Sequence, residues 1–98
     1  MEKISYIRQI ETEDGMGDTM YLCYFVSCNE KEGEKSYGVG IDMYTQKYSE
    51  RTGKERQAVN NIFRTKLEAE LFAEMLFKGL VTPTTLSDIV EDHFKELA

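Results

Sequence analysis

The spacing of hydrophobic residues changes at Thr65, and this change constrains the fold more than any other feature of the chain. Before Thr65, apolar and polar residues alternate at the two-residue period of β-strands, whereas after it apolar residues recur at helical spacing. Strands followed by helices, rather than alternating with them, predict an α+β fold. Because 98 residues can enclose one hydrophobic core, we expect a single domain over 1–98, with a sheet portion at 1–62 and a helical portion at 63–98.

The first half predicts an antiparallel meander of three or four strands. Runs rich in β-branched and aromatic residues, separated by glycine-containing polar turns, place strands at Ile4–Thr12, Thr19–Cys28 and Ser36–Tyr44. The stretch Thr45–Arg56 is polar and is predicted to be a turn region. Gln57–Ile62 could add a short fourth strand, although its alternation is poor.

The second half predicts two amphipathic helices that cover one face of this sheet. Thr65 followed by Glu68 is a capping box, and Gly79 suits the end of the first helix. Thr82 is placed to cap a second helix with Pro83 as its first residue. The expected core-facing residues are Leu67, Leu71, Phe72, Met75 and Leu76 on the first helix and Leu86, Ile89, Val90, Phe94 and Leu97 on the second.

The sheet face away from the helices has an uneven composition. Tyr21 and Phe25 alternate with core residues and so share that face with Gly38 and Gly40 of the next strand. Two interpretations remain open. The aromatic rings could fill the space above the glycines, as in aromatic rescue of strand glycines, or the face could be a contact surface for a protein partner or a second copy.

Positive charge is concentrated between residues 47 and 66 of an otherwise acidic chain with a net charge of −6. This segment is either a solvated loop or a local anion-binding patch, while the acidic remainder opposes nucleic acid as a partner. The candidate anion-binding residues are Arg51, Lys54, Arg56, Arg64 and Lys66.

No stretch has the pattern of a catalytic, cofactor or metal site, so no residue is assigned to one. Gly38-Val39-Gly40 lies within a predicted strand rather than before a helix, which disfavours a phosphate-binding loop. His93 is expected at the surface of the last helix. Cys23 and Cys28 are too far apart along one strand for a disulfide.

The setting expected for this chain is the cytoplasm. The longest apolar run, Met20–Val26, is far shorter than a membrane helix requires, and the first residues lack the pattern of a secretory signal. Two reduced cysteines agree with that compartment.

Two segments resemble a family of small uncharacterised proteins from clostridial-type Firmicutes, a domain of unknown function. The strand element is Tyr37-Gly38-Val39-Gly40-Ile41, and the helix element is Val81-Thr82-Pro83, Leu86 and Asp88-Ile89-Val90-Glu91-Asp92. His93 departs from the pattern, in which an apolar residue or phenylalanine is expected. The resemblance implies a bacterial cytosolic setting and supplies no activity.

The expected function is that of a small non-catalytic protein-interaction module that self-associates. One alternative is a small enzyme with an unrecognised site. The other is a weak nucleic-acid or anion binder that uses the basic segment 47–66.

Overall fold

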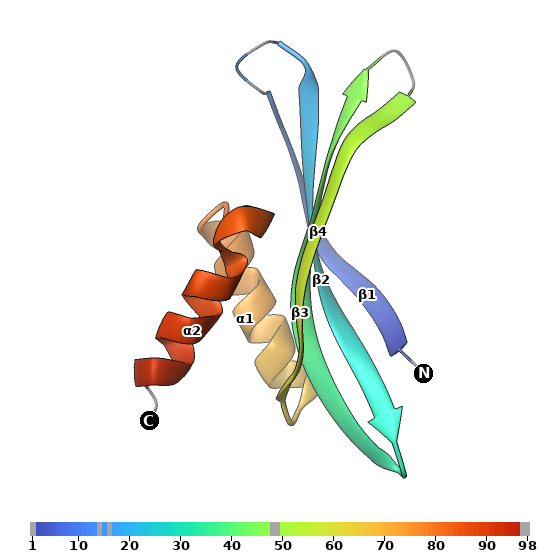
Figure 1. Cartoon of the computed structure of the whole chain (residues 1–98), viewed down its shortest axis with the longest axis vertical. Coiled ribbons are helices and arrows are strands. Elements are labelled where there is room, and N and C mark those ends of the chain that lie inside the picture. Colours follow the sequence, from blue (N-terminus) through green and yellow to red (C-terminus); the bar gives the residue numbers. More distant parts are fainter. Residues whose placement is uncertain (1, 14, 16, 48–49, 97–98) are drawn as a thin grey trace.

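The computed structural model describes residues 2–13, 15, 17–47 and 50–96, and it confirms the α+β class. Four antiparallel strands form one sheet in chain order, and two helices and a short 3₁₀ turn follow (Figure 1). The elements are β1 (Glu2–Glu13), β2 (Thr19–Lys31), β3 (Glu34–Lys47), β4 (Glu50–Phe63), α1 (Lys66–Lys78), the 3₁₀ turn η1 (Pro83–Thr85) and α2 (Leu86–Glu96).

The pairing of β2 with β3 sorts their side chains onto two faces as predicted. Tyr24 lies opposite Ile41 and Val26 opposite Val39 on the face that the helices cover. The alternate residues therefore project from the other side of the sheet.

The fourth strand is the main correction to the predicted sheet. It spans 14 residues rather than the six of Gln57–Ile62, and β3 extends to Lys47, so the expected turn region Thr45–Arg56 is mostly strand. β4 is an edge strand whose residues 53–58 are all exposed, so burial imposes no alternation on its sequence.

Irregular pairing interrupts both edges of the sheet. On β4, one extra residue lies near Gly53 and two lie near Asn61, and both of these residues have positive φ. On β1, Ile7 is an extra residue between the partners of Phe25 and Tyr24. Such bulges shift which side chains point to each face and increase the local twist.

The ends of α1 follow the sequence signals closely. The Thr65 hydroxyl accepts a hydrogen bond from the Glu68 amide at 3.2 Å, which confirms the predicted cap. The helix ends at Gly79, as predicted, but the residue with left-handed backbone is Leu80, with φ of 51°. The Val81 amide donates to the Leu76 carbonyl at 3.1 Å, which closes a Schellman-type end.

The second helix begins with a turn of 3₁₀ helix. Thr82 precedes η1 in extended conformation, and Pro83 is the first residue of that turn, as expected, but the Thr82 side chain makes no capping hydrogen bond. α2 then starts at Leu86.

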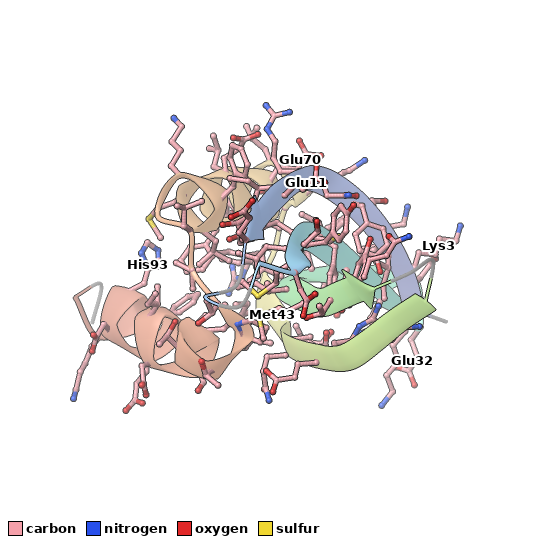
Figure 2. The ribbon with its side chains drawn as sticks, turned by 90° about the horizontal axis from the view of Figure 1, so that it is seen from above. Lys3, Glu11, Glu32, Met43, Glu70 and His93 are labelled. Carbon is pink, nitrogen blue, oxygen red and sulfur yellow. The ribbon has the colours of Figure 1, made fainter. Side chains whose placement is uncertain are left out.

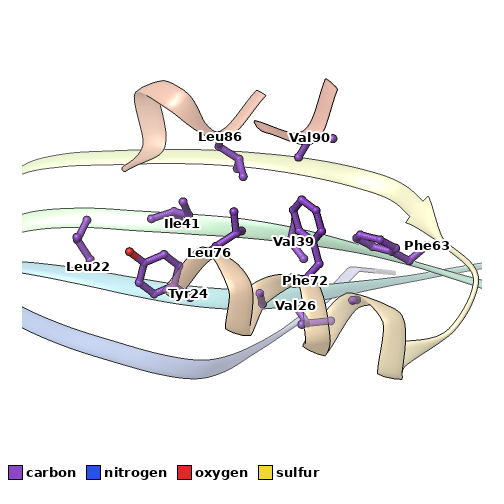
Figure 3. Packing of buried hydrophobic residues seen from close by; sticks show 12 residues of the cluster. Leu22, Tyr24, Val26, Val39, Ile41, Phe63, Phe72, Leu76, Leu86 and Val90 are labelled. Atoms are coloured by element: carbon purple, nitrogen blue, oxygen red, sulfur yellow. The ribbon is translucent and has the colours of Figure 1, made fainter. Parts of the chain in front are cut away.

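The core lies between the helices and one face of the sheet (Figure 3). Tyr24 is fully buried there, and its hydroxyl donates to the Val81 carbonyl at 2.8 Å; burial raises the pKa of Tyr24 to about 12. The buried cluster consists of Leu22, Tyr24, Val26, Val39, Ile41, Phe63, Ala69, Phe72, Ala73, Leu76, Leu86 and Val90.

The predicted inner face of α1 is partly wrong. Phe72 and Leu76 are buried as expected, but Leu67, Leu71 and Met75 are 64 %, 62 % and 44 % exposed. Ala69 and Ala73 take their place in the core, because their short side chains let the helix backbone lie close to the sheet. We refer to Leu67, Leu71 and Met75 as the α1 stripe.

The molecule is elongated, with extents of 44 × 30 × 17 Å. Figure 1 shows that the ends of the β1–β2 and β3–β4 hairpins extend beyond the helices. No helix in the described part of the chain is long and apolar enough to cross a membrane.

Candidate functional site on the open face of the sheet

The sheet face opposite the helices, here called the open face, is where the aromatic residues singled out by the sequence meet. All four strands contribute to it, because the residues that alternate with the core point this way. Its central residues are Tyr6, Gln9 and Glu11 of β1, Tyr21, Cys23 and Phe25 of β2, Gly40, Asp42 and Tyr44 of β3, and Arg56 of β4.

Phe25 lies beneath this face rather than on it. Its ring lies against Gly40, where an added Cβ would come within 3.0 Å of three ring carbons, and the side chain is fully buried. Tyr6 packs edge-on against the ring at 5.6 Å, and the Arg56 guanidinium lies 4.9 Å from its centroid. The structure therefore favours the first interpretation for Phe25, in which its ring fills the space above Gly40. The residues around Phe25, such as Tyr6, form the exposed part of the face.

Gly38 has a different neighbour. A Cβ at this position would meet the carbonyl of Val59 and the backbone of Asn60, where β4 bulges toward β3. The Ser27 hydroxyl beside it donates to the Asn60 side-chain oxygen at 3.1 Å. Gly38 thus accommodates the bulge and offers no surface to a partner.

Tyr6, Asp42 and Arg56 form a closed hydrogen-bonded cluster above Phe25. Arg56 donates from Nε to Asp42 Oδ1 at 2.6 Å and from Nη2 to Oδ2 at 2.8 Å. The Tyr6 hydroxyl donates to Asp42 Oδ2 at 2.5 Å and accepts from Arg56 Nη2 at 2.9 Å. These bonds hold three side chains from three strands in one geometry.

The cluster shifts the ionisation of its members. Burial would raise the pKa of Asp42, but the hydrogen bonds from Arg56 and Tyr6 and the Arg56 charge outweigh it, so the pKa lies below its ordinary value. The hydrogen bond to Asp42, together with burial, raises the pKa of Tyr6. Asp42 is therefore a carboxylate and Tyr6 a phenol at neutral pH.

A hollow of about 620 Å³ opens beside the cluster. On the same face Tyr44 stacks on Tyr21, with ring centroids 5.0 Å apart and planes at 19°. The volume is within the usual range of binding pockets. The hollow is lined by Tyr6, Gln9, Cys23, Asp42, Met43, Tyr44, Lys54, Glu55 and Arg56.

The basic segment does not form one continuous patch. Lys54 and Arg56 line the hollow, whereas Arg64 and Lys66 follow the far end of β4, roughly 20 Å from Arg56 along the strand direction. Arg56 is already bonded to Asp42, and Lys66 lies 3.7 Å from Glu70. The side chain of Arg51 lies outside the described residues.

His93 and the cysteines do not add a second site. The His93 ring is half-buried and packs edge-on against Phe72 at 4.8 Å, between the two helices. Cys23 and Cys28 are not joined in a disulfide, and Cys23 is buried. Among the described residues, no three His, Cys, Asp or Glu side chains are grouped to hold a metal ion.

The predicted contact residues of this face included neither Tyr6 nor Asp42. The alternation of β3 places Asp42 on the same face as Gly38 and Gly40, which was the available signal. Its pairing with Arg56 depends on how β4 aligns with β3. The bulges of β4 shift this alignment, so the sequence pattern does not predict it.

The chain was compared with known protein families, curated proteins and solved structures. A family model described as a family of unknown function, DUF6514, matches residues 1–96. No curated protein and no solved structure matches the chain significantly.

Proposed function

Since the chain belongs to DUF6514, a family of unknown function, we propose from its geometry that it is a small non-catalytic protein-interaction module that self-associates through the open face. The proposal assigns no catalytic residue and no cofactor. It places the module in the cytoplasm, in keeping with two cysteines that form no disulfide.

The observation that carries the proposal is a surplus of exposed surface. The solvent-accessible area is 6768 Å², whereas a compact monomer of 11.4 kDa exposes about 5,800 Å². The surplus of about 1,000 Å² is comparable to the roughly 800 Å² that each partner buries in a standard interface. The radius of gyration, 14.4 Å, likewise exceeds the ~12.6 Å typical of this chain length.

The residues of the open face also suit a contact surface. Tyrosine and arginine are enriched at interface hot spots, and Tyr6, 55 % exposed, lies beside Arg56. The hydrogen bonds to Asp42 and the contacts with Phe25 fix both side chains before any partner arrives. Binding would therefore cost little side-chain entropy.

Charge supports a second copy as the occupant of this face. Lys54 and Arg56 lie near one edge, and Glu11 lies on β1 at the opposite edge. A two-fold arrangement of two such faces can bring the cationic edge of one copy near the acidic edge of the other.

Light scattering coupled to size exclusion tests the proposal. We expect twice the chain mass of 11.4 kDa at micromolar concentration. Tyr6→Ser and Lys54→Glu should each weaken the dimer at least about tenfold. Lys95→Glu makes the same charge change on exposed α2 and should leave the dimer intact.

Circular dichroism of each variant separates lost association from lost folding. Tyr6→Ser uncovers part of Phe25 and costs some stability, so Lys54→Glu supplies the milder test. A wild-type protein with the mass of one chain throughout the micromolar range would overturn the proposal, as would dimers that both variants leave unchanged.

A further inference from the structure

The hollow on the open face lies above a row of residues that crosses the whole sheet. The row contains one residue from each strand, namely Gln9, Cys23, Asp42 and Arg56. β1 and β4 are the outer strands, so the row runs from one border of the sheet to the other (Figure 2). Cys23 is buried and lies in the floor of the hollow. Both borders of the sheet therefore contribute to one site.

Aromatic rings line the hollow on both sides of this row. Along an antiparallel strand, residues two positions apart are roughly 7 Å apart on the same face. Tyr6 belongs to the next row on one side, and Tyr44 to the next row on the other. Both of them line the hollow. A flat aromatic ligand between two tyrosine rings matches this space in shape and in polarity.

The polar groups at the β4 border of the hollow have hydrogen-bond donors that the described residues do not use. Arg56 donates from Nε and Nη2 to Asp42 and Tyr6, and its Nη1 forms no hydrogen bond with a described residue. Lys54 forms no salt bridge with a described residue. Asp42, in contrast, already accepts three hydrogen bonds. A ligand group at this border would therefore meet donors and an unpaired cation.

The placement of the charges, rather than their number, selects an anion. The charged residues that line the hollow are two acids and two bases, Asp42, Glu55, Lys54 and Arg56. Asp42 and Arg56 are paired with each other at 2.6 Å. Glu55 alternates with Lys54 and Arg56 along β4, so its side chain leaves the strand on the other side. Lys54 lies close enough to Asp42 to act on it electrostatically, and it is the cation left for a ligand.

We propose that the hollow binds a small planar aromatic carboxylate. The carboxylate would accept hydrogen bonds from Lys54 Nζ and Arg56 Nη1, and the ring would lie between Tyr6 and Tyr44. Gln9, at the β1 end of the row, can donate to or accept from a polar substituent on the ring. The ligand carries one acidic group rather than several, because one cation is unpaired.

This inference goes beyond self-association and does not rest on it. The hollow lies within the open face, so a ligand and a second copy would meet there, but separate measurements report on each. The mass in solution reports self-association, and a ligand titration reports binding per chain. A dimer that binds no aromatic carboxylate would overturn this inference alone. A protein that binds one and stays a monomer would overturn the proposed self-association alone.

An NMR titration of the full chain with naphthoate tests the inference, because shifts of the backbone amides locate the site. We expect saturation below about 1 mM, with the largest shifts at Cys23, Lys54 and Arg56. Naphthamide keeps the rings but lacks the charge, and it should bind at least about tenfold more weakly. Acetate and inorganic phosphate lack the rings and should not displace naphthoate at equal concentration.

Lys54→Gln is the variant that tests the assigned cation. Lys54 is exposed, so the fold should tolerate the change. Naphthoate binding should weaken at least about tenfold, while naphthamide binding stays unchanged and shows that the hollow keeps its shape. Lys95→Gln makes the same change on exposed α2 and should leave both ligands unaffected. Tyr44→Leu should weaken both ligands roughly three- to tenfold.

Three results would overturn the inference. Naphthoate causes no saturable shifts at the hollow, naphthamide or inorganic phosphate binds as tightly as naphthoate, or Lys54→Gln weakens naphthoate binding no more than Lys95→Gln does. The first result counts against the inference whatever the mass of the protein in solution.

Discussion

The ring of Phe25 on β2 lies against the backbone of Gly40 on β3, at the position that a side chain of residue 40 would occupy. This relationship converts a glycine in the middle of a strand, which weakens a sheet, into a tightly packed site. It also gives the open face a buried foundation, because Phe25 supports both Tyr6 and Arg56.

Adding a methyl group at Gly40 should therefore destabilise the fold. We expect Gly40→Ala to lower the free energy of unfolding by about 1–3 kcal/mol, since the Phe25 ring must move. Gly15→Ala is the matched control, because no atom lies within 4 Å of a Cβ there, and it should change stability by less than about 0.5 kcal/mol. Urea denaturation measures both.

A double variant checks that the cost arises from this one contact. Phe25→Leu leaves more room above residue 40, so the effects of Phe25→Leu and Gly40→Ala should be less than additive. Strict additivity of the two costs would contradict the proposed packing.

The Tyr6–Asp42–Arg56 cluster predicts an acid-dependent part of the stability. Because the folded state lowers the pKa of Asp42, the cluster's contribution is fully present above the unfolded pKa of about 3.9 and is lost as pH falls through the lower folded value. Asp42→Asn should lack this dependence. The difference in unfolding free energy between wild type and Asp42→Asn should be constant near neutral pH and should shrink below about pH 4.

Arg56→Lys is the companion variant for this measurement. Lysine keeps the positive charge but cannot donate the two parallel bonds that Arg56 gives Asp42. The acid-dependent difference should become smaller in this background. A difference that grows as pH falls would show that the sign of the Asp42 shift is wrong.

The two sides of α1 should respond differently to truncation. Leu76 is fully buried, and Leu76→Ala should cost about 2–5 kcal/mol of unfolding free energy. Leu71 is 62 % exposed, and Leu71→Ala should change stability by less than about 0.5 kcal/mol. Equal losses in thermal or urea unfolding would mean that the stripe belongs to the core.

Leu80 occupies a backbone conformation that suits glycine. With φ of 51°, its Cβ strains the chain, so Leu80→Gly should be more stable than Leu80→Ala by about 1 kcal/mol. The alanine variant controls for loss of the half-exposed leucine side chain. If alanine were the more stable of the two in urea denaturation, Leu80 would not be held in the left-handed region.

Segments with one buried face could be predicted from the sequence, because burial on one side enforces a regular apolar pattern. The faces of β2 and β3 could be assigned because one face of each is buried, which enforces alternation through Tyr24, Val26, Val39 and Ile41. The Thr65–Glu68 cap could be assigned because it needs only residues three apart. The antiparallel order of the strands and the ends of α1 could be predicted from such short-range patterns.

The errors occurred where those constraints are absent. Residues 53–58 of β4 are exposed, so no periodic pattern marks the strand. For α1, spacing alone cannot distinguish an apolar line that enters the core from one that faces solvent. Ala69 and Ala73 allow α1 to lie close to the sheet, so the side that carries them faces the core. This choice depends on how the helix packs on the sheet, which the spacing does not show.

The irregular edge formed by β4 has a consequence for the behaviour of the protein at high concentration. A regular edge strand is a template to which further strands can add without limit, as in fibrils. The kinks at Gly53 and Asn61 remove the even row of backbone donors and acceptors that such growth requires. The chain itself thereby opposes the addition of further strands at its β4 edge.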